Sequence, residues 1–124
     1  IFKNKSESYF RKIESEITLQ ELKKNNSVIS LGGGAFLNKT IRNTTKRTSV
    51  SFWIDVNTNE LIKRLKKSNK RPLLYKKNIS DTIEKIYLKR EKIYHKADYR
   101  IKCSFLKSNE IIKKILKLYE NSGN

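Results

Sequence analysis

The first candidates for a functional site are three consecutive glycines, Gly32, Gly33 and Gly34. They follow the stretch 28–31, whose apolar residues are typical of a buried strand. Because glycine has no Cβ, a strand that ends in glycines lets the backbone approach a ligand closely. In an open α/β sheet, ligands bind beyond the carboxyl ends of the strands. The run therefore predicts a ligand-binding turn, or else a flexible turn after a strand.

Basic residues outnumber acidic ones in this chain, and lysine outnumbers arginine. The chain has 29 lysine and arginine residues against 12 acidic ones, for a formal net charge of +17. Such a charge attracts nucleic acids, anionic membranes or anionic small molecules. The lysines scatter along the chain instead of clustering, so compositional bias is the preferred explanation of the charge. With 22 lysines and only 7 arginines, each arginine is the more informative cation.

Cysteine and histidine occur once each, as Cys103 and His95. A disulfide framework and a Cys/His metal site are thereby excluded, and we expect both residues to be structural. The sequence has no apolar run of membrane-spanning length and no signal peptide, which predicts a cytoplasmic protein. It starts at Ile1 and contains no methionine, which indicates a piece of a longer protein. Its 124 residues still suffice for one domain with a core.

Helices and strands are predicted to alternate along the chain. Apolar periodicity predicts helices over 6–25, 58–68, 80–94 and 109–119, with Thr58 or Asn59 and Asn109 as caps. The short polar stretch 38–46 is expected to be helical at its start. Apolar or alternating stretches predict strands over 27–31, 50–56 and 98–104. Such alternation favours a parallel sheet with helices packed on it. Three strands are few for such a sheet, which again indicates missing sequence.

Five segments match one known pattern in order and spacing. They are Ile1-Phe2 with Glu7 and 10–14 (FRKIE), 30–35 (SLGGGA), 53–56 (WIDV), 71–74 (RPLL), and Arg90 and Tyr94 with Ala97-Asp98. Over almost the whole chain this order resembles the shikimate kinase family, the small P-loop kinases of aromatic amino-acid biosynthesis. The resemblance implies ATP-dependent phosphorylation of the 3-hydroxyl of shikimate. It also implies an α/β fold of the P-loop NTPase type, a three-layer parallel sheet flanked by helices.

Two motifs of the family pattern are absent from this sequence. The Walker A loop, G-x-x-x-x-G-K-[ST], and the Asp-x-Asp turn after the second strand are absent, and both lie upstream of Ile1 in the family. The resemblance therefore implies the carboxyl-terminal two-thirds of a single domain, 1–124, without the P-loop strand and the next strand. It implies that the ligands of Mg²⁺ and the general base lie upstream, that the chain itself holds no metal ligand, and that the fragment alone is inactive. Asp55 and Asp98 are interpreted as structural residues at the end of a strand and of a helix.

The resemblance assigns a substrate-binding role to the helix region 1–25, the glycine run and one later arginine. Arg11 and Arg90 are expected to clamp the shikimate carboxylate, because planar guanidinium groups donate two parallel hydrogen bonds. Glu14, three residues after Arg11, would orient it. Gly32, Gly33 and Gly34 would present backbone N–H groups to the substrate hydroxyls.

The resemblance also assigns residues to the ATP side. Arg71, in a lid over 66–80, is expected to be catalytic, because phosphoryl transfer spreads negative charge that a closing cation neutralises. Arg64 would lie near the adenine, and Lys107 matches the adenine-side loop after the last strand. Phe10 and Leu73 are expected to form apolar walls against the substrate ring.

Two other functions remain open at this stage. One is a related P-loop kinase of the gluconate-kinase type, against which the paired Arg11 and Arg90 argue. The other is a basic nucleic-acid-binding module, which predicts exposed aromatic residues within a basic stripe. Phe52 and Trp53 lie instead in a strand that is expected to be buried, and no RRM, KH or zinc signature is present. We therefore expect a monomer that binds shikimate and ATP, and neither nucleic acid nor membrane.

Overall fold

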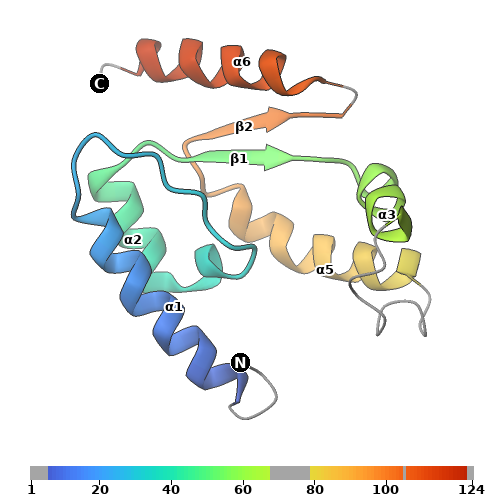
Figure 1. Ribbon diagram of the computed structural model, residues 1–124, viewed down its shortest axis with the longest axis horizontal. Helices are drawn as coiled ribbons and strands as arrows, with labels where there is room; N and C mark the ends of the chain where they lie inside the picture. Colours follow the sequence, from blue (N-terminus) through green and yellow to red (C-terminus); the bar gives the residue numbers. More distant parts are fainter. Residues whose placement is uncertain (1–5, 68–78, 105, 123–124) are drawn as a thin grey trace. The chain divides into compact units, whose positions relative to one another are not determined.

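The computed structural model describes residues 6–67, 79–104 and 106–122. The chain forms two compact units, Ile1–Ser51 and Phe52–Asn124, and each is described by itself. The elements are α-helices and a short parallel sheet (Figure 1), which confirms the α/β class. The single-domain organisation of 1–124 stays a prediction.

The first unit consists of two helices and the chain that joins them. Helix α1 (Glu7–Leu22) begins after Ser6, whose hydroxyl accepts a hydrogen bond from the amide of Tyr9 at 3.2 Å. The short 3₁₀ helix η1 (Ala35–Leu37) leads into α2 (Lys39–Thr48), which is capped by Asn38. The helices enclose a core of Leu22, Ala35 and Ile41, with Leu19, Ile29 and Leu31 packed against it. Helix α1 confirms the helix predicted from the apolar periodicity of 6–25, and α2 confirms the helical start expected for the polar stretch 38–46.

The prediction of a strand over 27–31 is wrong for the part of the chain that the structure describes. This segment belongs to no sheet, and Val28 is fully exposed. A strand exists only where a neighbouring strand supplies partners for its backbone N–H and C=O groups. Among the described residues no strand pairs with this segment, so its apolar residues Ile29 and Leu31 serve the core of the first unit instead.

The second unit is a parallel pair of strands with helical connections. Strand β1 (Phe52–Asp55) is followed by α3 (Thr58–Lys67) and α5 (Ile79–Tyr94), which pack against each other. Strand β2 (Tyr99–Lys102) pairs with β1 in register, Phe52 opposite Tyr99 and Asp55 opposite Lys102. Helix α6 (Ser108–Asn121) then runs beside β2 (Figure 1). A helical crossover between parallel strands is the connection that the predicted alternation requires.

Two predicted caps differ from those observed. The amide of Glu60 donates to the side-chain oxygen of Asn57 at 2.8 Å, so Asn57 caps α3 instead of Thr58 or Asn59. Helix α6 begins one residue before Asn109, with Lys107 at the cap position and no side-chain cap hydrogen bond. Several polar residues stand in a row at each site, and only the backbone turn decides which of them reaches a free amide.

Candidate functional site

The first part of the predicted site is an arginine held by its own helix. Nη1 of Arg11 donates to Oε1 of Glu14 at 2.8 Å, and Nη2 lies 3.6 Å from a carboxylate oxygen of Glu7. Both partners lie within one helical turn of Arg11, where side chains meet. The hydrogen bond to Glu14 raises the pKa of Arg11 above its ordinary value, so the guanidinium stays charged. The predicted pairing of Arg11 with Glu14 is therefore present.

The glycine run lies directly against this arginine. A Cβ built on Gly34 would lie 2.6 Å from Cζ and 2.7 Å from Nη2 of Arg11, and one on Gly32 would lie 3.0 Å from Oε2 of Glu14. Real Cβ atoms do not approach other atoms as closely as the first two distances. The absence of a side chain at Gly34 thus makes room for the Arg11 guanidinium. The sequence predicted close approach at this turn, but it did not identify Arg11 as the group that approaches.

The 3₁₀ helix η1, which follows the glycine turn, is held by a residue that was not predicted from the sequence. The amide of Ala35 donates to the carbonyl of Gly32 at 3.1 Å, which closes the turn. The guanidinium of Arg42, on α2, donates to the carbonyls of Phe36 at 3.0 Å and Leu37 at 2.8 Å. Arg42 thereby satisfies carbonyls at the end of η1 that have no helical partner. The scarcity of arginine in a lysine-rich chain was the one signal that pointed to it.

Arg90 lies in the second unit, on α5. Arg90 is half-buried, and its side chain makes no hydrogen bond or ion pair with any of the described residues. Arg11, by contrast, lies in the first unit and is held by two carboxylates. The predicted convergence of Arg11 and Arg90 therefore stays a prediction.

The residues predicted for the ATP side differ in what the structure says of them. Arg64 is exposed on α3 and pairs with Glu60 across one helical turn, at 3.0 Å. Lys107 is exposed at the start of α6, where its carbonyl accepts from the amides of Glu110 and Ile111. Arg71 and most of the predicted lid, including Leu73, lie outside the described residues. The nucleotide roles of all three cations stay predictions.

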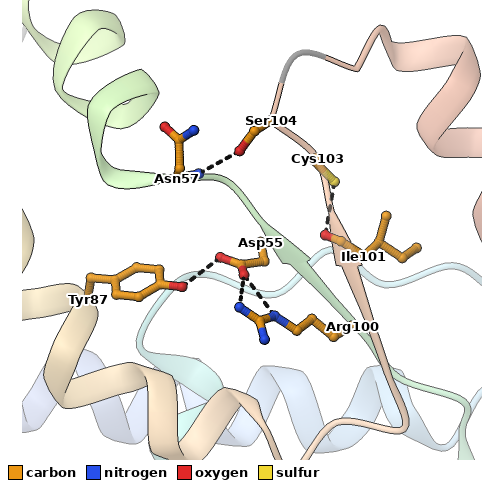
Figure 2. Close-up of polar contacts among 7 residues, drawn as sticks. All are labelled: Asp55, Asn57, Tyr87, Arg100, Ile101, Cys103 and Ser104. Atoms are coloured by element: carbon orange, nitrogen blue, oxygen red, sulfur yellow. Dashed lines mark hydrogen bonds and ion pairs between the residues drawn. The ribbon is translucent and has the colours of Figure 1, made fainter.

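The carboxylate of Asp55, at the end of β1, is held by several hydrogen bonds within the second unit. The residue is 6% exposed, and it accepts hydrogen bonds from the Tyr87 hydroxyl at 3.0 Å and from Nε of Arg100 at 2.8 Å (Figure 2). Its carbonyl also accepts from the amide of Cys103 at 2.9 Å. The hydrogen bond to Asp55 raises the pKa of Arg100. The pKa of Tyr87 is raised mainly by burial of its hydroxyl and, to a smaller extent, by its hydrogen bond to Asp55. Asp55 therefore joins β1, β2 and α5, as its interpretation as a structural residue implies.

Sequence reasoning did not connect Tyr87 and Arg100 with Asp55. These partners lie 32 and 45 residues away from it, so no local spacing reveals the contact. Near them, Cys103 is 3% exposed, and burial raises the pKa of its thiol, as expected for a structural cysteine.

Two further features of the described residues bear on ligands. Among residues 6–67, 79–104 and 106–122, the structure brings together no group of three or more His, Cys, Asp or Glu side chains that could hold a metal ion. A shallow cleft of about 350 Å³ lies between β2 and α6, and no predicted site residue lines it. Its lining residues are Arg100, Ile101, Lys102, Lys114, Lys117 and Leu118.

Within the same described ranges, no helix combines the length and the apolar character that crossing a membrane would demand.

Comparison with known proteins decides the family. The profile described as "SKI: Shikimate kinase" matches residues 1–120. The chain belongs to the shikimate kinase family. It is 38% identical over 123 residues to the shikimate kinase of Aquifex aeolicus and 36% identical over 124 residues to that of Thermodesulfovibrio yellowstonii. Solved shikimate kinases agree in fold: that of Aquifex aeolicus has a TM-score of 0.83 at 36% identity, and that of Bacteroides thetaiotaomicron 0.82 at 26% identity.

The chain covers only part of these shikimate kinases. It spans 71% of the Aquifex aeolicus sequence and 72% of the Thermodesulfovibrio yellowstonii sequence. It spans 48% and 57% of the relatives from Bartonella henselae and Bartonella quintana. The two solved structures likewise match 99% of this chain but 71% and 73% of their own lengths.

Proposed function

We propose that this chain forms the shikimate-binding part and the lid of an ATP-dependent kinase that phosphorylates the 3-hydroxyl of shikimate. The observation that carries the proposal is the packing of the Arg11 guanidinium over Gly34 while Glu14 holds it from the side. Membership of the shikimate kinase family supports the proposed reaction. The position of the Arg11 guanidinium explains why residue 34 has no side chain.

Arg11 is suited to hold a carboxylate because its orientation is set before any ligand binds. Glu14 takes one N–H of the guanidinium at 2.8 Å, and the side chain of Arg11 remains 38% exposed. Nη2 also lies 3.6 Å from a carboxylate oxygen of Glu7, in an ion pair whose Glu7 side chain is 73% exposed, so a planar anion would share or replace that partner. A guanidinium binds such an anion through parallel hydrogen bonds. Holding a side chain in its binding geometry lowers the entropy lost on association. We assign Arg11 to one side of the substrate carboxylate.

Arg90 is the second cation in this proposal. It is half-buried on α5 and makes no side-chain ion pair with any residue that the structure describes, so a ligand would displace no partner from among those residues. A carboxylate gripped from two directions fixes the orientation of the ring that carries it. The 3-hydroxyl would thereby be held in one position relative to the phosphoryl donor, which is the main contribution that proteins make to phosphoryl transfer.

ATP and Mg²⁺ are the cofactors of this proposal, but the described residues do not form their cradle. They include no Walker A sequence and no group of three acidic or histidine side chains. We assign the phosphates and the metal to a segment outside this chain, and Arg71 to the charge on the transferred group. Arg64 and Lys107 would contribute positive charge on the adenine side. The proposed protein is a cytoplasmic monomer.

The clamp is tested by removing each guanidinium in the complete protein, the form that includes the Walker A loop. Arg11→Ala and Arg90→Ala should each lower kcat/KM for shikimate about a hundredfold, or about 2.7 kcal/mol of transition-state stabilisation. The KM for ATP should change less than about twofold, because neither arginine is assigned to the nucleotide. Arg47→Ala is the matched control, since Arg47 is exposed on α2 and its side chain has no partner among the described residues. A loss confined to ATP would contradict the clamp.

The contacts of Trp53 and Phe52, the aromatic residues on β1, do not favour the nucleic-acid alternative. Trp53 is 7% exposed, and its ring is covered by Arg100, whose guanidinium carbon lies 4.5 Å from the ring centroid. Phe52 stacks on Tyr99 across the strands at 5.5 Å. Aromatic rings that bind single-stranded nucleic acid must be open for base stacking.

A further inference from the structure

Helix α5 is attached to the sheet at two positions that flank Arg90. The first is Tyr87, whose hydroxyl donates to the buried carboxylate of Asp55 at 3.0 Å (Figure 2). Arg100 holds the same carboxylate from the other side through Nε at 2.8 Å, so Asp55 has a fixed orientation. Because Asp55 is the last residue of β1, this contact attaches α5 to the carboxyl end of that strand.

The second attachment is aromatic and lies at the end of α5. The rings of Tyr94 and His95 lie 5.9 Å and 4.8 Å from that of Trp53, centroid to centroid, and the His95 contact is edge-on. Trp53 is held in turn by the guanidinium of Arg100. Asp55 and Trp53, two residues apart on β1, therefore fix both ends of one segment of α5.

Arg90 lies inside that segment, on the same side of the helix. It follows Tyr87 by three residues and precedes Tyr94 by four, and such spacings place side chains on one helix face. Its own side chain makes no hydrogen bond or ion pair with a described residue. As far as residues 6–67, 79–104 and 106–122 show, the position of Arg90 is set by the anchoring of its backbone and not by a partner of its guanidinium.

We infer that Tyr87 is a positioning residue for Arg90: its hydrogen bond to Asp55 sets the place from which Arg90 reaches the substrate carboxylate. This inference rests on the proposed function, because it needs Arg90 to bind that carboxylate. Tyr87 touches neither the substrate nor ATP in this scheme. Its effect should therefore appear as weaker use of shikimate and pass entirely through Arg90.

The test is a double-mutant cycle in the complete protein. Tyr87→Phe removes the hydroxyl and leaves the ring that packs near Trp53. It should raise the KM for shikimate about tenfold and leave the KM for ATP within about twofold. In the Arg90→Ala background, the same substitution should change the KM for shikimate less than about twofold, because the residue through which Tyr87 acts is gone.

A matched control separates this effect from the loss of a phenol as such. Tyr99→Phe deletes the same group from β2, where Tyr99 stacks on Phe52 and its hydroxyl has no partner among the described residues. Tyr99→Phe should leave both KM values unchanged.

The outcomes distinguish this inference from the proposed function. If Arg90→Ala raises the KM for shikimate but Tyr87→Phe does not, the positioning role is wrong and the clamp stands. Equal effects of Tyr87→Phe with and without Arg90 would show a general structural role, which also overturns the inference. If Arg90→Ala has no effect on shikimate, the clamp and the positioning role fail together.

Discussion

A single methyl group added at Gly34 should test the site more sharply than removal of Arg11. The Cβ of Gly34→Ala would lie 2.6 Å from Cζ of Arg11, whereas ordinary contacts begin at 3.4 Å. The guanidinium must move by about 0.8 Å or more to relieve this overlap. We expect such a movement to weaken the 2.8 Å hydrogen bond to Glu14 and to displace the donors that we propose hold the substrate.

The fold should tolerate the same methyl group. Gly34 has φ −94° and ψ −12°, which an alanine adopts without strain. Replacing glycine at such a position stabilises a protein by about 0.4–1 kcal/mol through the unfolded state. The lost ion pair of Arg11 and Glu14 is partly exposed and is worth about 0.2–1 kcal/mol. These contributions nearly cancel, so the free energy of unfolding should change by less than about 1 kcal/mol.

The expected result is a functional loss in a stable protein. A misplacement of about 1 Å can cost about a hundredfold, so we expect kcat/KM for shikimate to fall about ten- to a hundredfold. The assay is ADP release by the complete protein at varied shikimate and at varied ATP, together with thermal unfolding. In the Arg11→Ala background, Gly34→Ala should cause little further loss, because the group that clashes is absent.

Two results would refute this reasoning. One is an unchanged KM for shikimate in Gly34→Ala, which would mean that Arg11 does not need its place over the turn. The other is a large loss of thermal stability, which would mean that the backbone and not the guanidinium absorbs the methyl group. Gly32→Ala is the milder control, since its Cβ would lie 3.0 Å from Oε2 of Glu14 and a shift of a few tenths of an ångström relieves that contact.

Two further predictions concern stability. The pKa of Tyr87 is raised by burial and by Asp55. The stabilisation that the neutral Tyr87 hydroxyl contributes to the folded state is therefore complete below the unfolded-state pKa of 10.0. This stabilisation is lost as the pH rises through the higher folded-state pKa. Denaturant titrations from pH 9 to 12 should therefore show wild type and Tyr87→Phe converging at the alkaline end, and a constant difference would contradict the shift. Thr45 is 5% exposed and its hydroxyl has no hydrogen-bond partner among the described residues, so Thr45→Val should raise the free energy of unfolding by up to about 1 kcal/mol in denaturant unfolding. A loss of stability in Thr45→Val would show that the hydroxyl is satisfied.

The helices and the family could be predicted from the sequence because both depend on local order. A helix face repeats every three to four residues, so the apolar spacing of 80–94 was enough to predict α5. The motifs SLGGGA and RPLL are contiguous, and their order along the chain indicated the family that the comparison confirms. The pair of Arg11 and Glu14 was also local, since three residues separate them on one helix.

The tertiary structure alone decided the contacts between distant segments. Residues 27–31 have a strand-like sequence, but pairing needs a neighbouring strand, and the described residues supply none to this segment. Arg11 and Gly34 are 23 positions apart in the numbering, and Asp55 and Arg100 are 45 apart. No periodic pattern encodes such contacts, because they arise only when helices and strands pack. The sequence thus predicted which residues could bind an acid, and packing decided that the missing side chain at Gly34 gives Arg11 its place.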